Sequence, residues 1–256
     1  MKIHVVGAGV VGKATGEGFK RYGHQVVYSD KGDNLDVEAD LHLICTPEDT
    51  VPLVLVELYR GISDPALVRA PVVIRSSVPP GTTEELARQY PRLNLFHNPE
   101  FLREAMAESD FLHADRAIIG WGNRGRPFCH PLEDLYAQLG VPVHRCPSTM
   151  SEMVKLVTNS YLATQLGFWQ NIKWLCEAMR LNSHELGALV ALDSRVSSYG
   201  PKMHGTSYGH TKCLPKDLAQ LIDVGLRAGV DVSLLHAVKL VDLMAFAKEK
   251  ACESSS

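Results

Sequence analysis

Short, nearly continuous apolar runs alternate with helical patterns along the first part of the chain. Runs of this kind are typical of strands that a parallel sheet buries on both faces. Stretches with helical spacing, such as Val51–Arg60 and Thr82–Gln89, lie between several of them. This alternation predicts an α/β domain with a doubly wound parallel sheet over residues 1–148. The predicted strands are Ile3–Val6, Gln25–Tyr28, Leu41–Cys45, Pro71–Ile74, Leu93–Phe96, Ala117–Ile119 and Val141–Val143.

After residue 148 the pattern becomes helical throughout. Glu152–Glu177 carries apolar residues at a helical period over a length that exceeds the usual globular helix. Asp217–Glu249 has the same character and is interrupted at residues 229–231, while Ser194–Thr211 is rich in Ser, Gly, Tyr and His and is predicted to be a loop. We therefore expect a second, all-helical domain over residues 149–256.

Composition and charge narrow the class of protein. The chain has 256 residues, 45% hydrophobic and 21% charged, which is a globular composition with room for one large or two small domains. A net charge of −3 without a basic cluster argues against a nucleic-acid partner or a membrane surface. No apolar run approaches the roughly 18 residues that a membrane-spanning helix needs. The N-terminus runs into a glycine loop and is expected to be a strand, not a signal peptide.

Six cysteines occur at irregular spacing, and none belongs to a CxxC pair. This usage favours a reduced, cytoplasmic protein over a disulfide framework. His144 with Cys146 and His210 with Cys213 have spacings that could ligate zinc, but two isolated pairs are a weak signal. We expect no metal.

A glycine loop follows the first predicted strand. Residues 7–12 read Gly-Ala-Gly-Val-Val-Gly, in which the glycines permit a tight turn, close approach of the backbone to a pyrophosphate, and close packing of helix on strand. Asp30 ends the second predicted strand 18 residues after Gly12, where a carboxylate hydrogen-bonds ribose hydroxyls. Its charge favours NAD over NADP, although Lys31 works in the opposite direction. The expected cofactor contacts here are Gly7, Gly9, Val10, Val11, Gly12, Asp30 and Lys31.

The connection after Asp30 is short. About ten residues separate it from the third predicted strand at Leu41, which is too few for a full crossover helix. We therefore expect a reduced adenine side of the cofactor site.

Polar segments interrupt otherwise apolar surroundings at Arg75–Thr82, Asn98–Glu104, Glu152–Asn159 and Cys213–Asp217. In the last segment, Pro215 suits a first helical turn, which places Cys213 near a helix N-terminus that favours its thiolate, with Asp217 four residues on.

Two further pairs in these segments have the spacing of one helical turn. Lys155 and Asn159 can project from one side of a helix, where an ammonium and an amide stabilise a developing oxyanion. Glu100 and Glu104 repeat this spacing and offer a general base. Each residue alone has an ordinary structural explanation, such as a solvated helix face, and only the ordered set favours a catalytic site.

In this order behind the glycine loop, the four segments resemble the UDP-glucose/GDP-mannose dehydrogenase family over nearly the whole chain. The resemblance implies oxidation of a primary alcohol to a carboxylate in two hydride transfers to NAD⁺. Cys213 would capture the aldehyde as a thiohemiacetal and then carry a thioester that water releases as the acid. Lys155 and Asn159 would stabilise the oxyanion, Glu100 and Asp217 would serve water activation and proton handling, and Ser77 (usually Thr in the family) would order the water.

The resemblance also implies binding contacts and an oligomeric state. Ser76 and Glu104 match positions near the nicotinamide, and Cys45, Thr46 and Pro47 match another cofactor contact. Arg195 resembles an arginine that reaches across a homodimer into the partner's substrate site, and the helical domain would form the dimer core. The residues expected to bind the small-molecule alcohol are Phe101, Leu102, Arg103, Arg195, His210 and Lys212.

The chain departs from the family in places that concern the substrate. Family members carry a third, C-terminal domain that grips the nucleotide, and the chain ends before it. Adjacent glycines usual before the cysteine are replaced by His210 and Thr211. We expect a sugar, nucleotide-sugar or nucleoside alcohol as substrate. Two alternatives stay open: a single-step, β-hydroxyacid-type dehydrogenase that needs no cysteine, or a non-catalytic module completed by a partner chain.

Overall fold

The computed structural model describes residues 1–61, 70–122 and 128–253, which form two compact units, Met1–Lys155 and Leu156–Ser256. The division between the units falls inside one long helix, α6 (Ser148–Met179).

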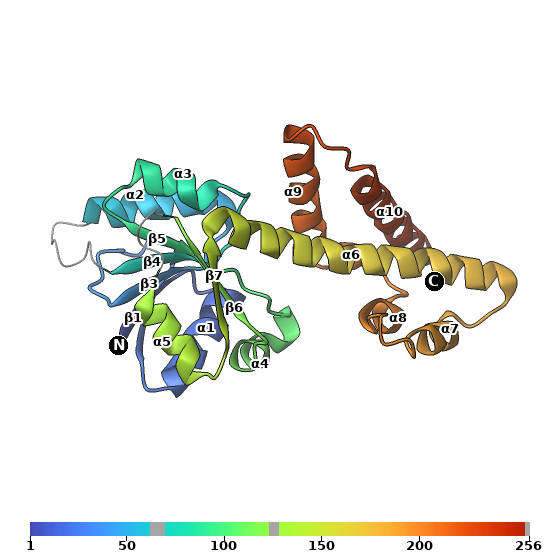
Figure 1. The fold of residues 1–256 in the computed structure, drawn as a ribbon, viewed down its shortest axis with the longest axis horizontal. Helices are drawn as coiled ribbons and strands as arrows, with labels where there is room; N and C mark the ends of the chain where they lie inside the picture. Colours follow the sequence, from blue (N-terminus) through green and yellow to red (C-terminus); the bar gives the residue numbers. More distant parts are fainter. Residues whose placement is uncertain (62–69, 123–127, 254–256) are drawn as a thin grey trace. The chain divides into compact units, whose positions relative to one another are not determined.

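The first unit is built on a seven-stranded sheet with the order β2-β1-β3-β4-β5-β6-β7 (Figure 1). All neighbouring strands are parallel except β5 and β6, which pair antiparallel through Phe96 and His97. The predicted fold class is therefore confirmed, with one antiparallel pair that the strand pattern did not reveal. The strands are β1 (Lys2–Val6), β2 (Gln25–Ser29), β3 (Leu41–Ile44), β4 (Pro71–Ile74), β5 (Asn94–His97), β6 (Ala117–Trp121) and β7 (Val143–Pro147).

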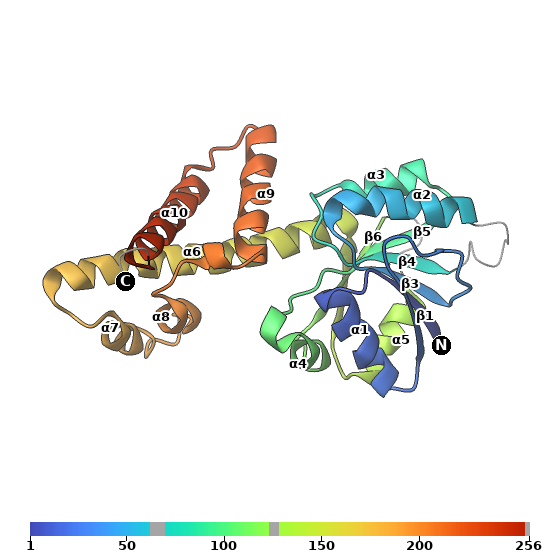
Figure 2. The same ribbon diagram turned by 180° about the vertical axis from the view of Figure 1, so that it is seen from behind.

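Helices cover both faces of this sheet, and each face has its own apolar core (Figures 1 and 2). Ile3 and Val5 face the core that includes Phe19 of α1, whereas Val6 faces the core of α2 and α3, as alternation along a strand requires. The helices are α1 (Val10–Arg21), α2 (Val51–Gly61), α3 (Thr82–Gln89), α4 (Ala107–Leu112) and α5 (His130–Gln138), with short 3₁₀ turns η1 (Glu48–Thr50) and η3 (Glu104–Met106).

No helix connects β2 to β3, as the short spacing predicts. Residues 30–40 instead form an irregular connection in which Leu35 is buried in the core of α2 and α3. Next to this connection the sheet is polar: His4 is fully buried, and its ring lies 3.0 Å (Nδ1 to Nδ1) from His42 and 2.9 Å (Nε2 to Oγ) from Ser29. These side chains occupy the part of the face that lacks a crossover helix.

The second unit is helical. Its core joins Ala163 and Leu166 of α6 to Leu218 and Ile222 of α9 and Val238 of α10. The region Ser194–Thr211, predicted to be a loop, contains two short turns of helix, α8 and η4, so the prediction was wrong there. The remaining elements are α7 (Ser183–Val190), α8 (Tyr199–Met203), η4 (Tyr208–His210), α9 (Cys213–Arg227) and α10 (Ser233–Glu253). Within the described ranges, no helix has the length and apolarity to cross a bilayer.

Candidate active site

The glycine loop has a geometry that only glycine allows at two positions. Gly7 has φ +99°, and a Cβ there would lie 2.8 Å from the backbone of Cys45. A Cβ on Gly12 would lie 1.9 Å from the carbonyl oxygen of Gly7. Gly9 is the N-cap residue of α1, and a Cβ there would meet no atom within 4 Å. The start of α1 therefore offers backbone N–H groups and room to a diphosphate, so these residues fit a dinucleotide.

The ends of β1, β3 and β4 bring further predicted cofactor residues together. Cys45 donates its N–H to Val6 O at 2.7 Å, and the hydroxyl of Ser76 donates to Thr46 O at 2.6 Å. Pro47 follows and precedes η1. Burial raises the pKa of the Cys45 thiol to about 11. The thiol therefore stays protonated at neutral pH and is unreactive.

Glu104 lies near the glycine loop although it is 92 positions further along the chain than Gly12. A cavity of ≈440 Å³ between α1 and the segment of η3 and α4 is lined by both Val10 and Glu104, together with Lys13. The structure thus brings together two groups of residues expected to bind the cofactor.

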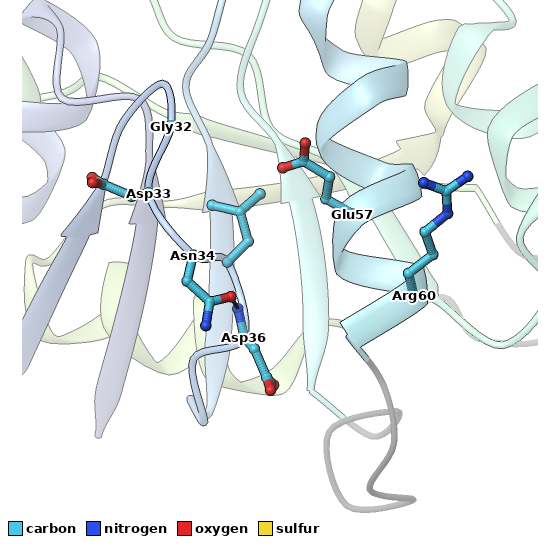
Figure 3. Close-up of a pocket in the computed structure, with 7 residues that line it drawn as sticks. Gly32, Asp33, Asn34, Asp36, Glu57 and Arg60 are labelled. Atoms are coloured by element: carbon cyan, nitrogen blue, oxygen red, sulfur yellow. Dashed lines mark hydrogen bonds between the residues drawn. The ribbon is translucent and has the colours of Figure 1, made fainter.

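A second cavity of ≈460 Å³ lies beside the connection that follows Asp30. Asp30 and Lys31 are exposed and are the first two residues of that connection. Asp30 donates its N–H to Asp33 Oδ2 at 2.7 Å. Figure 3 shows Asp33, Asn34 and Asp36 on one side and Glu57 and Arg60 of α2 on the other. Three carboxylates against one guanidinium disfavour a 2′-phosphate, which supports the preference for NAD expected from Asp30.

The loop after β5 is anchored by buried polar residues that sequence reasoning missed. Arg75 donates to Asn98 Oδ1 and, at 2.9 Å, to the hydroxyl of Tyr136, while Asn98 Nδ2 donates to Ile118 O at 2.7 Å. Arg75 and Asn98 were visible only as polar residues in an apolar setting. Because these side chains are buried and hydrogen-bonded, they fix the backbone that leads into Glu100.

Glu100 and Lys155 form a buried ion pair in the first unit. The Lys155 ammonium donates to Glu100 O at 2.7 Å and to its Oε1 at 3.0 Å, and the two side chains are only 4% and 10% exposed. The N–H of Leu102 donates to Glu100 Oε2 at 2.6 Å, and the Phe101 ring lies 5.4 Å from the ammonium. Arg103 is instead bound to Asp110 by three hydrogen bonds.

Glu152, one turn before Lys155, is another residue that sequence reasoning did not single out. Its carboxylate accepts the N–H groups of Gly81 at 2.6 Å and Thr83 at 2.8 Å, at the start of α3. Burial raises its pKa to about 7. This contact ties the loop that holds Ser76 and Ser77 to the helix that carries Lys155.

Asn159 and Asp217 form the corresponding pair in the second unit. Asn159 Nδ2 donates to Asp217 Oδ2 at 2.5 Å, and Asp217 is completely buried. Lys216 Nζ lies 3.0 Å from the other oxygen of Asp217. Cys213, an exposed thiol, is the first residue of α9 and stands one helical turn before Asp217.

The remaining predicted residues have partners of their own. His210 contacts Glu249 at 2.7 Å (Nε2 to Oε2), and Arg195 is bound to its neighbour Asp193, with closest atoms 2.6 Å apart. Lys212 is the N-cap residue of α9. Among the described residues, no three His, Cys, Asp or Glu side chains converge as ligands for a metal.

Comparisons with known proteins decide the family. Residues 37–140 match the NAD-binding domain of the UDP-glucose/GDP-mannose dehydrogenase family, and residues 149–242 match its central domain. The chain belongs to this family. The matched regions together cover more than half of the chain, and the glycine loop, residues 7–12, precedes the first of them. NAD is the cofactor of the family's N-terminal domain, and the glycine loop fits it.

Individual relatives agree with this assignment. A UDP-glucose 6-dehydrogenase from Rickettsia conorii is 34% identical over 176 residues, which are 65% of this chain and 39% of that protein. The chain thus spans about two fifths of the length of the curated relatives it matches.

Solved structures show the same fold. A UDP-glucose dehydrogenase from the hyperthermophilic archaeon Pyrobaculum islandicum superposes with a TM-score of 0.83 at 24% identity, over 95% of this chain and 68% of that one. A 3-hydroxyisobutyrate dehydrogenase from Mycobacterium tuberculosis gives 0.75 at 15% identity, over 95% of this chain and 93% of that one.

Proposed function

We propose that the protein is an NAD-dependent dehydrogenase that oxidises the primary alcohol of a nucleotide sugar or a related sugar to a carboxylate. The relatives named as UDP-glucose dehydrogenases support this substrate class. The observation that carries the proposal is the pairing along α6. Lys155 is held by Glu100, Asn159 is held by Asp217, and Cys213 stands one turn from Asp217.

Each group has a role in the proposed reaction that its contacts suit. NAD⁺, when bound beside the glycine loop, would supply the hydride acceptor, and a second molecule of NAD⁺ would be needed for the second oxidation. Glu100, already hydrogen-bonded to an ammonium, takes up a proton as the alcohol becomes the aldehyde. The Cys213 sulfur then adds to the aldehyde carbon, and Lys155 and Asn159 stabilise the resulting oxyanion as donors.

The second half of the reaction releases the acid. Loss of the second hydride converts the thiohemiacetal into a thioester, and water adds to its carbonyl carbon. The bond from carbon to Cys213 sulfur then breaks, which restores the thiol and frees the carboxylic acid. Asp217, flanked by Asn159 and Lys216, handles the proton of the attacking water, and Ser77 orders that water. The sum is one alcohol, one water and two NAD⁺ converted into one carboxylic acid, two NADH and two protons.

Counting NADH against product tests this proposal. Two NADH for each acid formed are expected from the wild-type protein, and Cys213→Ser is expected to form no acid. One NADH with a released aldehyde or ketone, unaffected by Cys213→Ser, would instead support the β-hydroxyacid-type reaction. A wild-type protein that is folded but neither reduces NAD⁺ nor is stabilised by it would support the module completed by a partner chain.

We also propose that the protein is a homodimer. Large apolar side chains of α6 are exposed along one face at spacings of four and seven residues, and five of them are more than half exposed: Met150, Tyr161, Phe168, Leu175 and Met179. In a twofold dimer this apolar face of α6 packs against the same face of a second copy, so both faces are removed from water. The six cysteines are all thiols, which suits the cytoplasm where we place the protein.

A further inference from the structure

Three consecutive residues, Ser207 to Gly209, donate four hydrogen bonds to two carboxylates of α10. Asp242 Oδ1 accepts the hydroxyl of Ser207 at 2.7 Å, the N–H of Tyr208 at 2.8 Å and the N–H of Gly209 at 3.3 Å. Glu249 Oε1 accepts the N–H of Ser207 at 2.6 Å. Because Asp242 is buried, these donors replace the water that its charge would otherwise need.

The same face of α10 holds the rest of this loop. Val238, Asp242, Phe246 and Glu249 follow at spacings of four, four and three residues, so they share one side of the helix. The Tyr208 hydroxyl donates to Val238 O at 3.3 Å, and the His210 ring lies 4.9 Å from the Phe246 ring while its Nε2 is 2.7 Å from Glu249 Oε2. Tyr208 is buried in the core of the second unit.

This loop leads directly into the reactive end of α9. Thr211 donates both its N–H and its hydroxyl to Tyr208 O at 2.8 Å, and Cys213 begins α9 two residues later. Lys212 is thus the only residue between the anchored loop and the thiol. We therefore expect a displacement of residues 207–211 to move the Cys213 sulfur, since a single residue separates them.

We propose that Asp242 and Glu249 are positioning residues that set the place of the Cys213 sulfur through residues 207–211. This proposal rests on the proposed function for its kinetic consequence, since Cys213 is the nucleophile there. Both carboxylates act through the hydrogen bonds that they make with residues 207–210. In this arrangement His210 binds residues 207–211 to α10 through Glu249 and Phe246, a role different from the substrate contact expected from the sequence.

The test removes each carboxylate and follows acid formation and aldehyde release. Asp242→Ala and Glu249→Ala are expected to lower kcat for the acid by on the order of tenfold to a hundredfold, the usual cost of a misplaced reacting group, with KM for NAD⁺ unchanged. Aldehyde, trapped by a hydrazine, is expected to accumulate because its capture by the sulfur is slowed. Asp242→Asn keeps an oxygen at the Oδ1 position, where all three bonds end, and is expected to restore kcat to within a few-fold.

A matched control is Glu177→Ala, which removes an exposed carboxylate of α6 and is expected to behave as wild type. Glu249 is less buried than Asp242, with a side chain that is 25% exposed, so Glu249→Ala remains informative if Asp242→Ala fails to fold. Wild-type kcat and no trapped aldehyde in folded Asp242→Ala and Glu249→Ala would overturn the proposal. A loss of kcat in which aldehyde does not appear and Asp242→Asn gives no rescue would also count against it.

Alkylation separates this proposal from the proposed function. Iodoacetamide labelling of Cys213, measured by mass spectrometry relative to the exposed Cys252 of the same chain, needs no substrate. The ratio is expected to change at least threefold in Asp242→Ala and to return in Asp242→Asn. If wild type forms no acid yet the ratio responds in this way, the positioning stands and the proposed reaction fails. An unchanged ratio in a folded Asp242→Ala protein overturns the positioning whatever the reaction is.

Discussion

The buried histidine pair beside the β2–β3 connection makes the stability of the first unit depend on pH. Burial, the neighbouring His42 ring and Lys2 lower the pKa of His4 from 6.5 to about 4, and burial lowers that of His42 to about 4. The two Nδ1 atoms are 3.0 Å apart, so one ring must donate to the other, which requires an unprotonated acceptor. We therefore expect the pair to be neutral at pH 7.

The direction follows from where the protons bind. In the unfolded chain each histidine binds a proton below pH 6.5, whereas in the folded protein it does so only near pH 4. The contribution of the two histidines to the free energy of unfolding is therefore fully present above pH 6.5, and it is lost as the pH falls from there toward 4. Between pH 7 and pH 5 this difference corresponds to about 2 kcal/mol of folding free energy for each histidine.

Urea unfolding at the two pH values measures this loss. The perturbation is the double variant His4→Leu/His42→Leu, which removes both titrating rings while keeping the positions apolar. Its stability at any one pH is not the readout, because Ser29 also loses a partner. The readout is the change between pH 7 and pH 5, which we expect to be smaller than that of wild type by about 4 kcal/mol if the contributions of both rings add.

Buried His97, whose pKa burial lowers to about 3, is present in both proteins, so its contribution cancels. His113→Leu, at an exposed position, serves as the control and is expected to keep the wild-type pH dependence. Equal losses of folding free energy between pH 7 and pH 5 in wild type and the double variant would refute the reasoning. The two histidines would then not be the groups that bind more protons in the unfolded chain than in the folded protein.

Three further variants test other contacts. Gly12→Ala is expected to abolish the rise in Tm with NAD⁺ measured by differential scanning fluorimetry, since its Cβ would meet Gly7 O; an undiminished rise would contradict the proposed cradle. Glu152→Ala leaves two N–H groups at the start of α3 without their acceptor and is expected to lower the free energy of unfolding, measured in urea, by about 1–3 kcal/mol. An unchanged free energy of unfolding would contradict this role of Glu152. Phe168→Asp is expected to give monomers in light scattering, whereas an unchanged dimer would place the interface elsewhere.

The sequence predicted elements well where the apolar pattern was local and strong. Thr82–Gln89 is a helix with the predicted bounds: Gly81 precedes it, its first turn is acidic, and its buried residues Thr83, Leu86 and Ala87 have helical spacing. The last strand was predicted at Val141–Val143 but begins at Val143, since it is an edge strand with exposed residues and a weak pattern. Helix α7 was missed because it is short and mostly exposed.

The candidate site could be predicted as a set of residues but not as a set of contacts. Spacing alone placed Lys155 and Asn159 on one helix. Their partners, however, lie 55 and 58 residues away in sequence, and no periodicity relates them. Glu152 was missed for the same reason, because its two acceptor contacts are to backbone groups that carry no sequence signal. His210 likewise depends on a partner, Glu249, that is 39 residues further on.

Helix α6 carries both of the donors that we propose for the oxyanion, Lys155 and Asn159. Lys155 closes the first unit and is bound by its Glu100, while Asn159, four residues on, is bound by Asp217 of the second. An α-helix fixes such residues about 6 Å apart along its axis and on nearly the same side. The sequence between them, Leu-Val-Thr, contains neither proline nor glycine, so nothing there interrupts the backbone hydrogen bonds. The spacing of the two donors proposed for the oxyanion is therefore set by the helix itself.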